Sequence, residues 1–112
     1  MKLLMMSGLA ASGKSTAAKE IAEQGNWVRL NRDILRTMLH FEKFSGRNEG
    51  ITVDCEKALA RTLLALGHNI IIDDTNLNPK NKEMWSTIAK ECGVSFEHKH
   101  IDTYWKECVY RD

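Results

Sequence analysis

The sequence predicts an α/β fold in which a four-stranded parallel sheet, of expected strand order 2-3-1-4, carries helices on both faces. Three observations predict this fold. Short apolar segments alternate with segments of helical periodicity, glycines stand where helices should end, and residues 8–15 place a glycine-rich loop between the first strand and the first helix. Strands that alternate with helices form parallel sheets with right-handed crossovers, and ligands then bind beyond the carboxyl ends of the strands.

The first expected strand, residues 2–6, leads directly into a segment that matches the phosphate-loop pattern G-x-x-x-x-G-K-[ST]. Gly8 and Gly13 allow backbone conformations that a side chain would forbid, so successive N–H groups can turn toward a phosphate. Lys14 is expected to reach the β- and γ-phosphates of ATP, and Ser15 is expected to hold Mg²⁺. The predicted ATP-binding residues are Gly8, Leu9, Ala10, Ala11, Ser12, Gly13, Lys14, Ser15 and Thr16.

Two helices and a strand are expected between residues 15 and 50. The helix over residues 15–24 has small and apolar side chains at helical spacing, and Gly25 follows it as a stop signal. Residues 27–30 form the second strand, and a short helix with four apolar side chains on one side begins at Ile34. The polar segment 41–50 contains glycines and is expected to be a loop.

A longer helix is expected to begin at a cap formed by Thr52 or Asp54 and to end before Gly67. Residues 69–73 follow as an uninterrupted β-branched run, which predicts the central strand, buried on both faces. The 3.6-residue period of the helix predicts an inner face made of Ala58, Leu59, Thr62, Leu63 and Leu66.

The last part of the chain is expected to form a helix, a strand and a final helix. Asn78 and Pro79 begin the first of these helices in the favoured order of cap and then proline, and Gly93 ends it. Residues 94–101 form the fourth strand, and the final helix runs to the end of the chain. The inner face of the helix before this strand is expected to contain Met84, Trp85, Ile88, Ala89 and Cys92.

The bulk properties describe one small globular domain. The chain has 112 residues and a formal net charge of +1, so any nucleic-acid binding would need a local basic patch. Its three cysteines match no zinc-binding spacing and favour free thiols in a reducing compartment. No apolar run approaches the roughly 20 residues that a membrane span needs. We therefore expect a cytoplasmic protein without a membrane partner, and the oligomeric state, a homo-oligomer included, stays open.

Polar side chains concentrate where the expected strands end. Asp33 follows the second strand and is the candidate general base, although its carboxylate could instead cap the next helix. Arg36 lies three residues later and can face the same cleft, where its guanidinium suits a phosphate; a solvated arginine is the alternative. Arg32 is expected to be exposed. The predicted catalytic residues are Asp33, Lys14 and Arg36.

Two adjacent carboxylates, Asp73 and Asp74, end the central strand. One is expected to face the site, and the other the surface or a backbone donor. Asp74 is predicted to act with Ser15 in the Mg²⁺ shell, directly or through water. Thr75 and Asn76 could form an ordinary turn with local side-chain hydrogen bonds.

Five motifs stand in order along the chain: Gly-Leu-Ala-Ala-Ser-Gly-Lys-Ser-Thr at 8–16, Asn-Arg-Asp-Ile-Leu-Arg at 31–36, Glu-Gly-Ile at 49–51, Asp-Thr-Asn-Leu-Asn-Pro at 74–79 and Glu-His-Lys at 97–99. Together they resemble the kinase domain of the phage polynucleotide 5′-kinases, in order and spacing, along essentially the whole chain. The run at 74–79 combined with Asn-Arg-Asp is far more selective than the phosphate loop alone.

The resemblance implies a P-loop kinase fold and transfer of the ATP γ-phosphate to the 5′-hydroxyl of DNA or RNA, for nucleic-acid repair. It implies that Lys14 and Ser15 take the triphosphate and the Mg²⁺, and that Asp33 is the base. Arg36 would bind the 3′-phosphate of the acceptor. Asp74 would help to organise the acceptor site, a role that competes with its metal-shell role. The implied acceptor-binding residues are Arg36, Asp74, Thr75 and Asn76.

One part of the family pattern is missing. In that family an arginine on a lid segment clamps the ATP phosphates; it falls a little beyond the end of this chain, and Arg111 does not clearly occupy its place. Residues 1–112 are therefore expected to form a single kinase domain that lacks its C-terminal lid segment. The location would be the host cytoplasm if the protein is phage-encoded. A small-metabolite kinase of the same fold and a nonenzymatic nucleotide-binding module are the alternatives.

Overall fold

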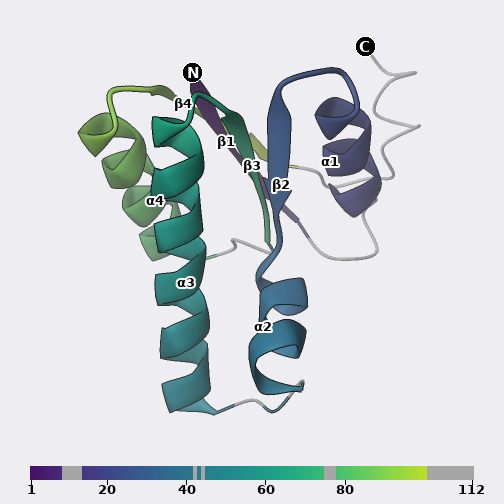
Figure 1. The fold of residues 1–112 in the computed structure, drawn as a ribbon, viewed down its shortest axis with the longest axis vertical. Coiled ribbons are helices and arrows are strands. Elements are labelled where there is room, and N and C mark those ends of the chain that lie inside the picture. The colour runs from purple at the N-terminus through teal and green to yellow at the C-terminus, as the bar shows by residue number, and fades with distance from the viewer. Residues whose placement is uncertain (9–13, 42, 44, 75–77, 101–112) are drawn as a thin grey trace.

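Over the described residues the chain alternates strands with one helix or, between the second and third strands, two, as a computed structural model shows (Figure 1). The structure describes residues 1–8, 14–41, 43, 45–74 and 78–100. The elements, in chain order, are β1 (Lys2–Ser7), α1 (Lys14–Ala22), β2 (Trp27–Leu30), α2 (Arg32–His40), α3 (Gly46–Ala65), β3 (Asn69–Asp73), α4 (Pro79–Glu91) and β4 (Ser95–His100).

The four strands form one parallel sheet in the order β2-β3-β1-β4, which confirms the predicted fold class and strand order. β1 and β3 are the central strands, and their pairing places Met5 beside Ile72. Five of the six residues of β1 and four of the five residues of β3 are buried. Runs of apolar side chains predicted these two strands because a strand covered on both faces has no solvent side.

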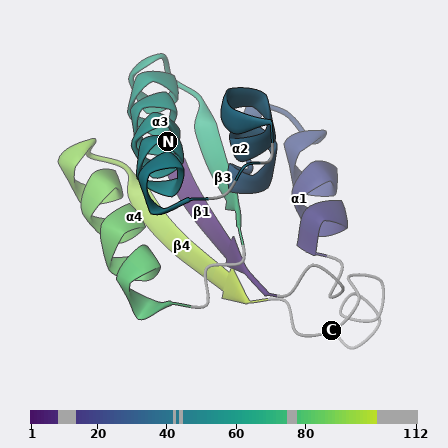
Figure 2. The same cartoon turned by 90° about the horizontal axis from the view of Figure 1, so that it is seen from below.

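Helices cover both faces of the sheet (Figure 2). On one face, Ala17 and Ala18 of α1 pack against Leu4, Met6 and Ile71, and small side chains let the helix approach the strands closely. On the other face α3 and α4 enclose a larger core. The buried side chains of that core are Leu3, Met5, Leu30, Ala60, Leu64, Ile70, Ile72, Trp85, Ile88 and Ala89.

The helix α4 begins and ends where the sequence predicts. The side chain of Asn78 accepts a hydrogen bond from the backbone N–H of Lys80 at 3.0 Å, and Pro79 is the first helical residue. Gly93 follows the helix with a φ of 69°, which a glycine adopts without steric cost. Trp85, Ile88 and Ala89 are buried, as expected for the inner face. The expected final helix and residue 101 lie outside the described residues.

The helix α3 begins earlier than the sequence predicts. Ser45 is its cap, because the Ser45 hydroxyl accepts the backbone N–H of Asn48 at 3.0 Å. The segment from Gly46 to Gly50 is therefore helical rather than a loop. Thr52 and Asp54, the predicted caps, lie inside the helix, and the Thr52 hydroxyl donates to the carbonyl of Asn48 instead.

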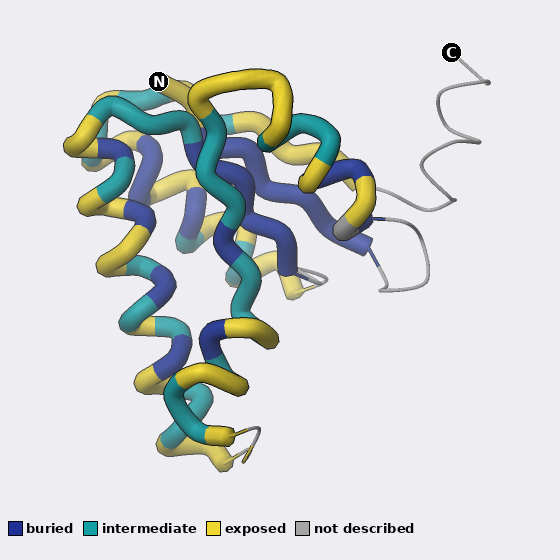
Figure 3. Tube along the Cα trace, turned by 45° about the vertical axis from the view of Figure 1, so that its right-hand side comes forward, coloured by how far each residue is buried: buried dark blue, intermediate teal, exposed yellow. Residues whose placement is uncertain are grey.

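The buried stripe of α3 also differs from the predicted inner face. It is made of residues spaced four apart, and two of its members, Thr52 and Glu56, are polar and fully buried. Ala58, Leu59, Thr62 and Leu66 are exposed and Leu63 is half-buried. The first half of α3 extends past the sheet beside α2, and exposed residues are frequent there (Figures 1 and 3). The inner face was predicted from apolar periodicity alone, and half of the residues in the buried stripe are polar. The stripe consists of Thr52, Glu56, Ala60 and Leu64.

Candidate functional site

The carboxyl ends of β1, β3 and β2 lie at one edge of the sheet because the strands are parallel. The phosphate-loop segment follows β1 there, and Gly8 has a φ of 140°, a value that favours glycine. Lys14 is the first residue of α1 and is buried, with 4% of its surface exposed. Ser15 and the exposed Thr16 follow in the same helix. Five predicted ATP-binding residues, Leu9, Ala10, Ala11, Ser12 and Gly13, lie outside the described residues.

A buried ion-pair cluster joins α1, β2 and β3 at this edge. Asp73 is fully buried; one of its carboxylate oxygens accepts from Lys14 Nζ at 2.6 Å, and the other accepts from Arg29 Nε at 2.7 Å. Burial alone would raise the pKa of Asp73, but the hydrogen bonds and charges of Lys14 and Arg29 outweigh it and hold the pKa below its ordinary value. Asp73 is therefore the carboxylate of the adjacent pair that contacts Lys14, the lysine of the phosphate-loop motif.

Asn31 connects β3 to α2. Its Oδ1 accepts the backbone N–H of Ile34 at 2.9 Å and so caps α2, while its Nδ2 donates to the carbonyl of Asp73 at 2.7 Å. The cap of α2 is thus Asn31 and not Asp33, which contradicts the capping alternative for Asp33. The same amide ties the end of β3 to the start of the helix that carries Arg36.

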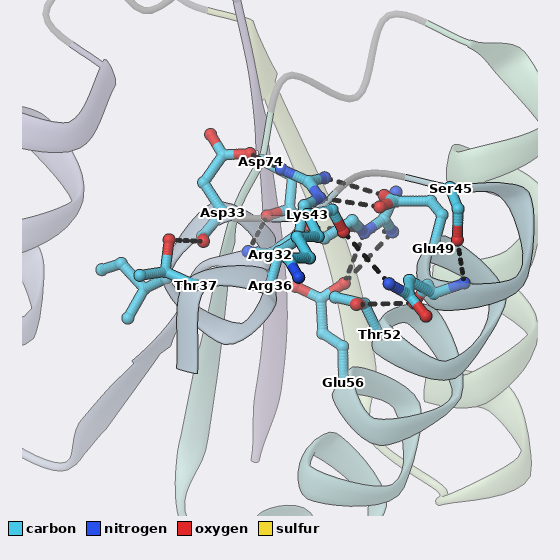
Figure 4. Close-up of polar contacts among 12 residues, drawn as sticks. Arg32, Asp33, Arg36, Thr37, Lys43, Ser45, Glu49, Thr52, Glu56 and Asp74 are labelled. Carbon is cyan, nitrogen blue, oxygen red and sulfur yellow. Dashed lines mark hydrogen bonds and ion pairs between the residues drawn. The ribbon is translucent and has the colours of Figure 1, made fainter. Parts of the chain in front are cut away.

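Asp33 and Arg36 lie in contact on α2, as their spacing predicts. Arg36 Nη1 donates to the Asp33 carboxylate at 2.6 Å, and the Asp33 side chain is 79% exposed. On its other side Arg36 forms a two-pronged pair with Glu49 of α3: Nε donates at 2.7 Å and Nη2 at 2.8 Å. Figure 4 shows these side chains from two helices pointing toward one another. Arg36 is therefore not a solvated arginine, because two carboxylates bind its guanidinium.

The pairing is reflected in the pKa values of the partners. The pKa of Arg36 is raised, first by its hydrogen bond to Glu49 and then, against the effect of burial, by Asp33. The pKa of Glu49 is lowered, first by the hydrogen bond from Arg36 and then, against burial, by the Arg36 charge. Two carboxylates thus hold the guanidinium in one orientation before any phosphate arrives.

A second buried cluster joins the start of α2 to β3 and α3 (Figure 4). The backbone N–H of Arg32 donates to Asp74 Oδ1 at 2.6 Å, so Asp74 faces a backbone donor, one of the two expected outcomes. The Arg32 side chain is only 15% exposed and binds Glu56 at 3.1 Å, which corrects the expectation that Arg32 is exposed. Burial, followed by the hydrogen bond to Asp74 and the Asp74 charge, raises the pKa of Glu56 to about 9.

The free energy of unfolding is expected to fall, through Glu56, as the pH rises from about 5 to about 9. In that window Glu56 loses its proton in the unfolded chain, where its ordinary pKa is 4.5, but keeps it in the folded protein. The folded state then binds more protons, so a rising pH favours unfolding. Glu56→Gln keeps the hydrogen-bond donor and cannot ionise. Urea unfolding at several pH values should give a flatter profile for Glu56→Gln; equal profiles would contradict the assignment.

Sequence reasoning missed three ionisable side chains that complete these clusters: Arg29, Glu49 as a partner of Arg36, and Glu56. Arg29 interrupts the apolar residues of β2, and a charge inside a short strand is a signal that it has a partner. Glu56 carried no comparable signal because its partners come from other elements. Thr75 and Asn76, predicted to bind the acceptor, lie outside the described residues.

Two histidines of β4 converge on Ser7 at the end of β1. The Ser7 hydroxyl lies 2.8 Å from His98 Nε2 and 2.9 Å from His100 Nδ1. Burial, and then the charges of Lys82 and His100, lower the pKa of His98. Within the described ranges no group of three or more histidine, cysteine or acidic side chains is arranged to hold a metal ion.

Comparisons with known proteins identify the fold. A family model described as an AAA domain matches residues 3–112. A chain in the solved structure of a Pnkp1/Rnl/Hen1 complex superposes with a TM-score of 0.82 and 32% identity, over 98% of this chain and 38% of that chain. The fold is therefore that of the P-loop kinases, and the domain is a nucleotide-binding domain.

Two curated proteins are similar in sequence over most of the chain. A protein of Autographa californica nuclear polyhedrosis virus, with the provisional name bifunctional polynucleotide kinase/RNA ligase, is 26% identical over 99% of this chain and 18% of its own length. The bifunctional polynucleotide phosphatase/kinase of Schizosaccharomyces pombe is 30% identical over 91% of this chain and 21% of its own length. The chain thus spans about a fifth of the length of these relatives. In the part of the chain that the structure describes, no helix has the length and apolar character needed to cross a bilayer.

Proposed function

This chain belongs to the AAA domain family, and we propose that it is a polynucleotide kinase domain, which transfers the γ-phosphate of ATP to the 5′-hydroxyl of a DNA or RNA end. One observation carries the proposal: Asp33 and Arg36 are in contact on α2, and the cap of that helix, Asn31, bonds the carbonyl of Asp73, the partner of Lys14. A base, a phosphate-binding cation and the phosphate-loop lysine are the groups that phosphoryl transfer to a hydroxyl needs. The names of the similar proteins support the same acceptor.

The reaction exchanges one P–O bond for another. The oxygen of the acceptor hydroxyl attacks the γ-phosphorus, the bond to the β–γ bridging oxygen breaks, and ADP leaves. Asp33 accepts the hydroxyl proton as the new bond forms. Because 79% of the Asp33 side chain is exposed, a long acceptor can reach it without passing through a closed pocket.

The same geometry gives Lys14 and Arg36 separate tasks. Lys14 stabilises charge on the β- and γ-phosphates, and Arg36 binds a phosphate of the acceptor through its guanidinium edge. Glu49 pairs with Nε and Nη2 of Arg36, and Asp33 pairs with Nη1, so α3 and Asp33 together orient the guanidinium. The base and the acceptor phosphate site therefore lie within one helical turn.

We propose Mg²⁺ as a companion of the nucleotide. Mg²⁺ binds hard oxygen donors, takes few protein ligands and keeps several waters. The predicted ligands are Ser15, next to Lys14 in α1, and Asp74, whose carboxylate lies at the end of β3. When bound, the ion would neutralise charge that develops on the transferred phosphoryl group. Asp74 has a second proposed role, to hold the start of α2 and thereby the acceptor site.

Transfer of label tests the proposal directly. The native chain is incubated with γ-labelled ATP, Mg²⁺ and an oligonucleotide that has a 5′-hydroxyl, and label is expected on the 5′ end. An oligonucleotide that already carries a 5′-phosphate is the matched control and should stay unlabelled. ATP binding without transfer to any hydroxyl would favour a nonenzymatic nucleotide-binding module, and transfer only to small hydroxyl compounds would favour a metabolite kinase.

Arg36→Ala is expected to raise the KM for acceptors that carry a 3′-phosphate, by about tenfold or more, with a smaller effect on acceptors that lack it. The reason is that the variant loses a charge-assisted contact with the acceptor's 3′-phosphate, worth about 1.5–3 kcal/mol. Steady-state kinetics with the two acceptors measures the difference. Arg61→Ala, which removes an arginine paired with Glu91 between α3 and α4, is the control. An unchanged KM would remove Arg36 from the acceptor site.

A further inference from the structure

The cluster of Lys14, Asp73 and Arg29 contains one carboxylate and two cations. Each oxygen of Asp73 has one cation: Lys14 Nζ lies 2.6 Å from Oδ1, and Arg29 Nε lies 2.7 Å from Oδ2. Asp73 is fully buried, Lys14 is almost fully buried, and the Arg29 side chain is 18% exposed. The three residues come from three different elements, so the fold and not local sequence brings them together.

In this arrangement the amine that a triphosphate requires is already bound to a protein carboxylate. A nucleotide can contact Lys14 only if the ammonium group leaves Asp73 or donates hydrogen bonds to Asp73 and to the phosphates at the same time. A buried carboxylate that loses its only cation is strongly destabilised. Asp73 does not lose its only cation, because Arg29 remains on the second oxygen.

We propose that Arg29 is a positioning residue for nucleotide binding: it shares the Asp73 carboxylate with Lys14 and so lets Lys14 move to the triphosphate. This inference rests on the nucleotide binding of the proposed function and assigns a residue outside the phosphate loop to it. Arg29 stays paired with Asp73 in both states. Lys14 exchanges one anion, the carboxylate, for another, the phosphates.

The chemistry of the two cations suits this division. Arg29 lies in β2, in register with Ile71 of β3, so its side chain leaves the sheet on the α1 face two residues from Asp73. Its guanidinium is planar and presents its N–H donors as a preorganised fork, one of which bonds Asp73. Lys14 carries a compact ammonium on a flexible four-carbon stem, which can swing between two nearby anions. In the proposed exchange Arg29 holds the carboxylate and Lys14 moves.

The affinity for ATP in the presence of EDTA tests the inference, because it reports on Lys14 without a metal ion. Isothermal titration calorimetry gives the Kd for the native chain, Arg29→Gln, Asp73→Asn and the double variant. Arg29→Gln is expected to raise the Kd about tenfold, since Asp73 then depends on Lys14 alone. In the double variant the carboxylate charge is gone as well, and the Kd should return to within about twofold of that of Asp73→Asn.

A different role for Arg29 predicts a different result. If Arg29 only attracted the triphosphate through its charge, Arg29→Gln would weaken binding by the same factor with Asp73 or with Asn at position 73. Such additive effects would overturn the inference, and so would an unchanged Kd for Arg29→Gln. Arg61→Gln makes the same charge change at an exposed pair with Glu91 and is expected to leave the Kd unchanged.

Two further measurements keep the test decisive. Circular dichroism and thermal unfolding show whether each variant folds. If Arg29→Gln does not fold, the double variant is compared with Asp73→Asn, and the inference predicts equal Kd values for these two proteins. The label-transfer assay on the same proteins separates the two proposals. If the effects of Arg29→Gln and Asp73→Asn on the Kd for ATP are coupled but no label reaches the oligonucleotide, the kinase proposal is rejected and this inference stands. If label is transferred but the two effects on the Kd are additive, the kinase proposal stands and this inference is rejected.

Discussion

Asp33→Asn is expected to reduce label transfer to the 5′-hydroxyl by about 10²–10⁴-fold while ATP still binds. An amide has nearly the shape of the carboxylate and can still accept the hydrogen bond from Arg36, but it cannot take the hydroxyl proton. The Asp33 side chain is 79% exposed, so the midpoint of thermal unfolding should change little. Single-turnover measurement with saturating ATP isolates the chemical step from binding.

Asp54→Asn is the matched control for this substitution, because Asp54 is an exposed carboxylate in α3. Its transfer rate is expected to equal that of the native chain. Near-native turnover of Asp33→Asn would show that another group takes the proton and that Asp33 serves only as a partner of Arg36.

Lys14→Ala is expected to lower kcat/KM for ATP by about 10²–10³-fold, the range for removal of one preorganised group that stabilises transition-state charge. The fold is expected to survive, because Asp73 keeps its bond to Arg29 when Lys14 is removed. The assay for label transfer and a thermal melt of the same sample measure the two effects. Lys19→Ala, at an exposed position of the same helix, is the control.

The two outcomes of the Lys14 experiment separate activity from stability. A variant that melts like the native chain but does not transfer label places the lysine at the triphosphate. Retention of near-native kcat/KM would mean that Lys14 serves Asp73 alone, as part of the structure.

The strands were predictable from sequence because each is encoded by a short run of neighbouring residues. The β-branched run at 69–73 and the short apolar run at 27–30 match β3 and β2 residue for residue. The parallel order then puts the ends of β1, β2 and β3 at one edge, which is why Asp33 and Lys14 could be assigned to a common site.

The charge partners were not predictable because they depend on contacts between elements. Glu56 sits in a buried stripe of α3 that is half polar and therefore has no apolar period, and its partner Arg32 begins a different helix. Arg29 reaches Asp73 only through the pairing of β2 with β3. The start of α3 was missed for a local reason: Ser45 precedes Gly46, and glycine lowers helix propensity without preventing a capped first turn.

The two side-chain hydrogen bonds of Asn31 would respond differently to conversion of its amide to a carboxylate. Hydrolysis of its side-chain amide would leave an oxygen to cap α2 but would put a second acceptor where a donor now meets the Asp73 carbonyl. Helix content would then persist while the β3 end and the acceptor helix separate. Asn31→Asp, which makes this change without altering the backbone, should therefore lose transfer activity but keep its circular dichroism; unchanged activity would refute this link.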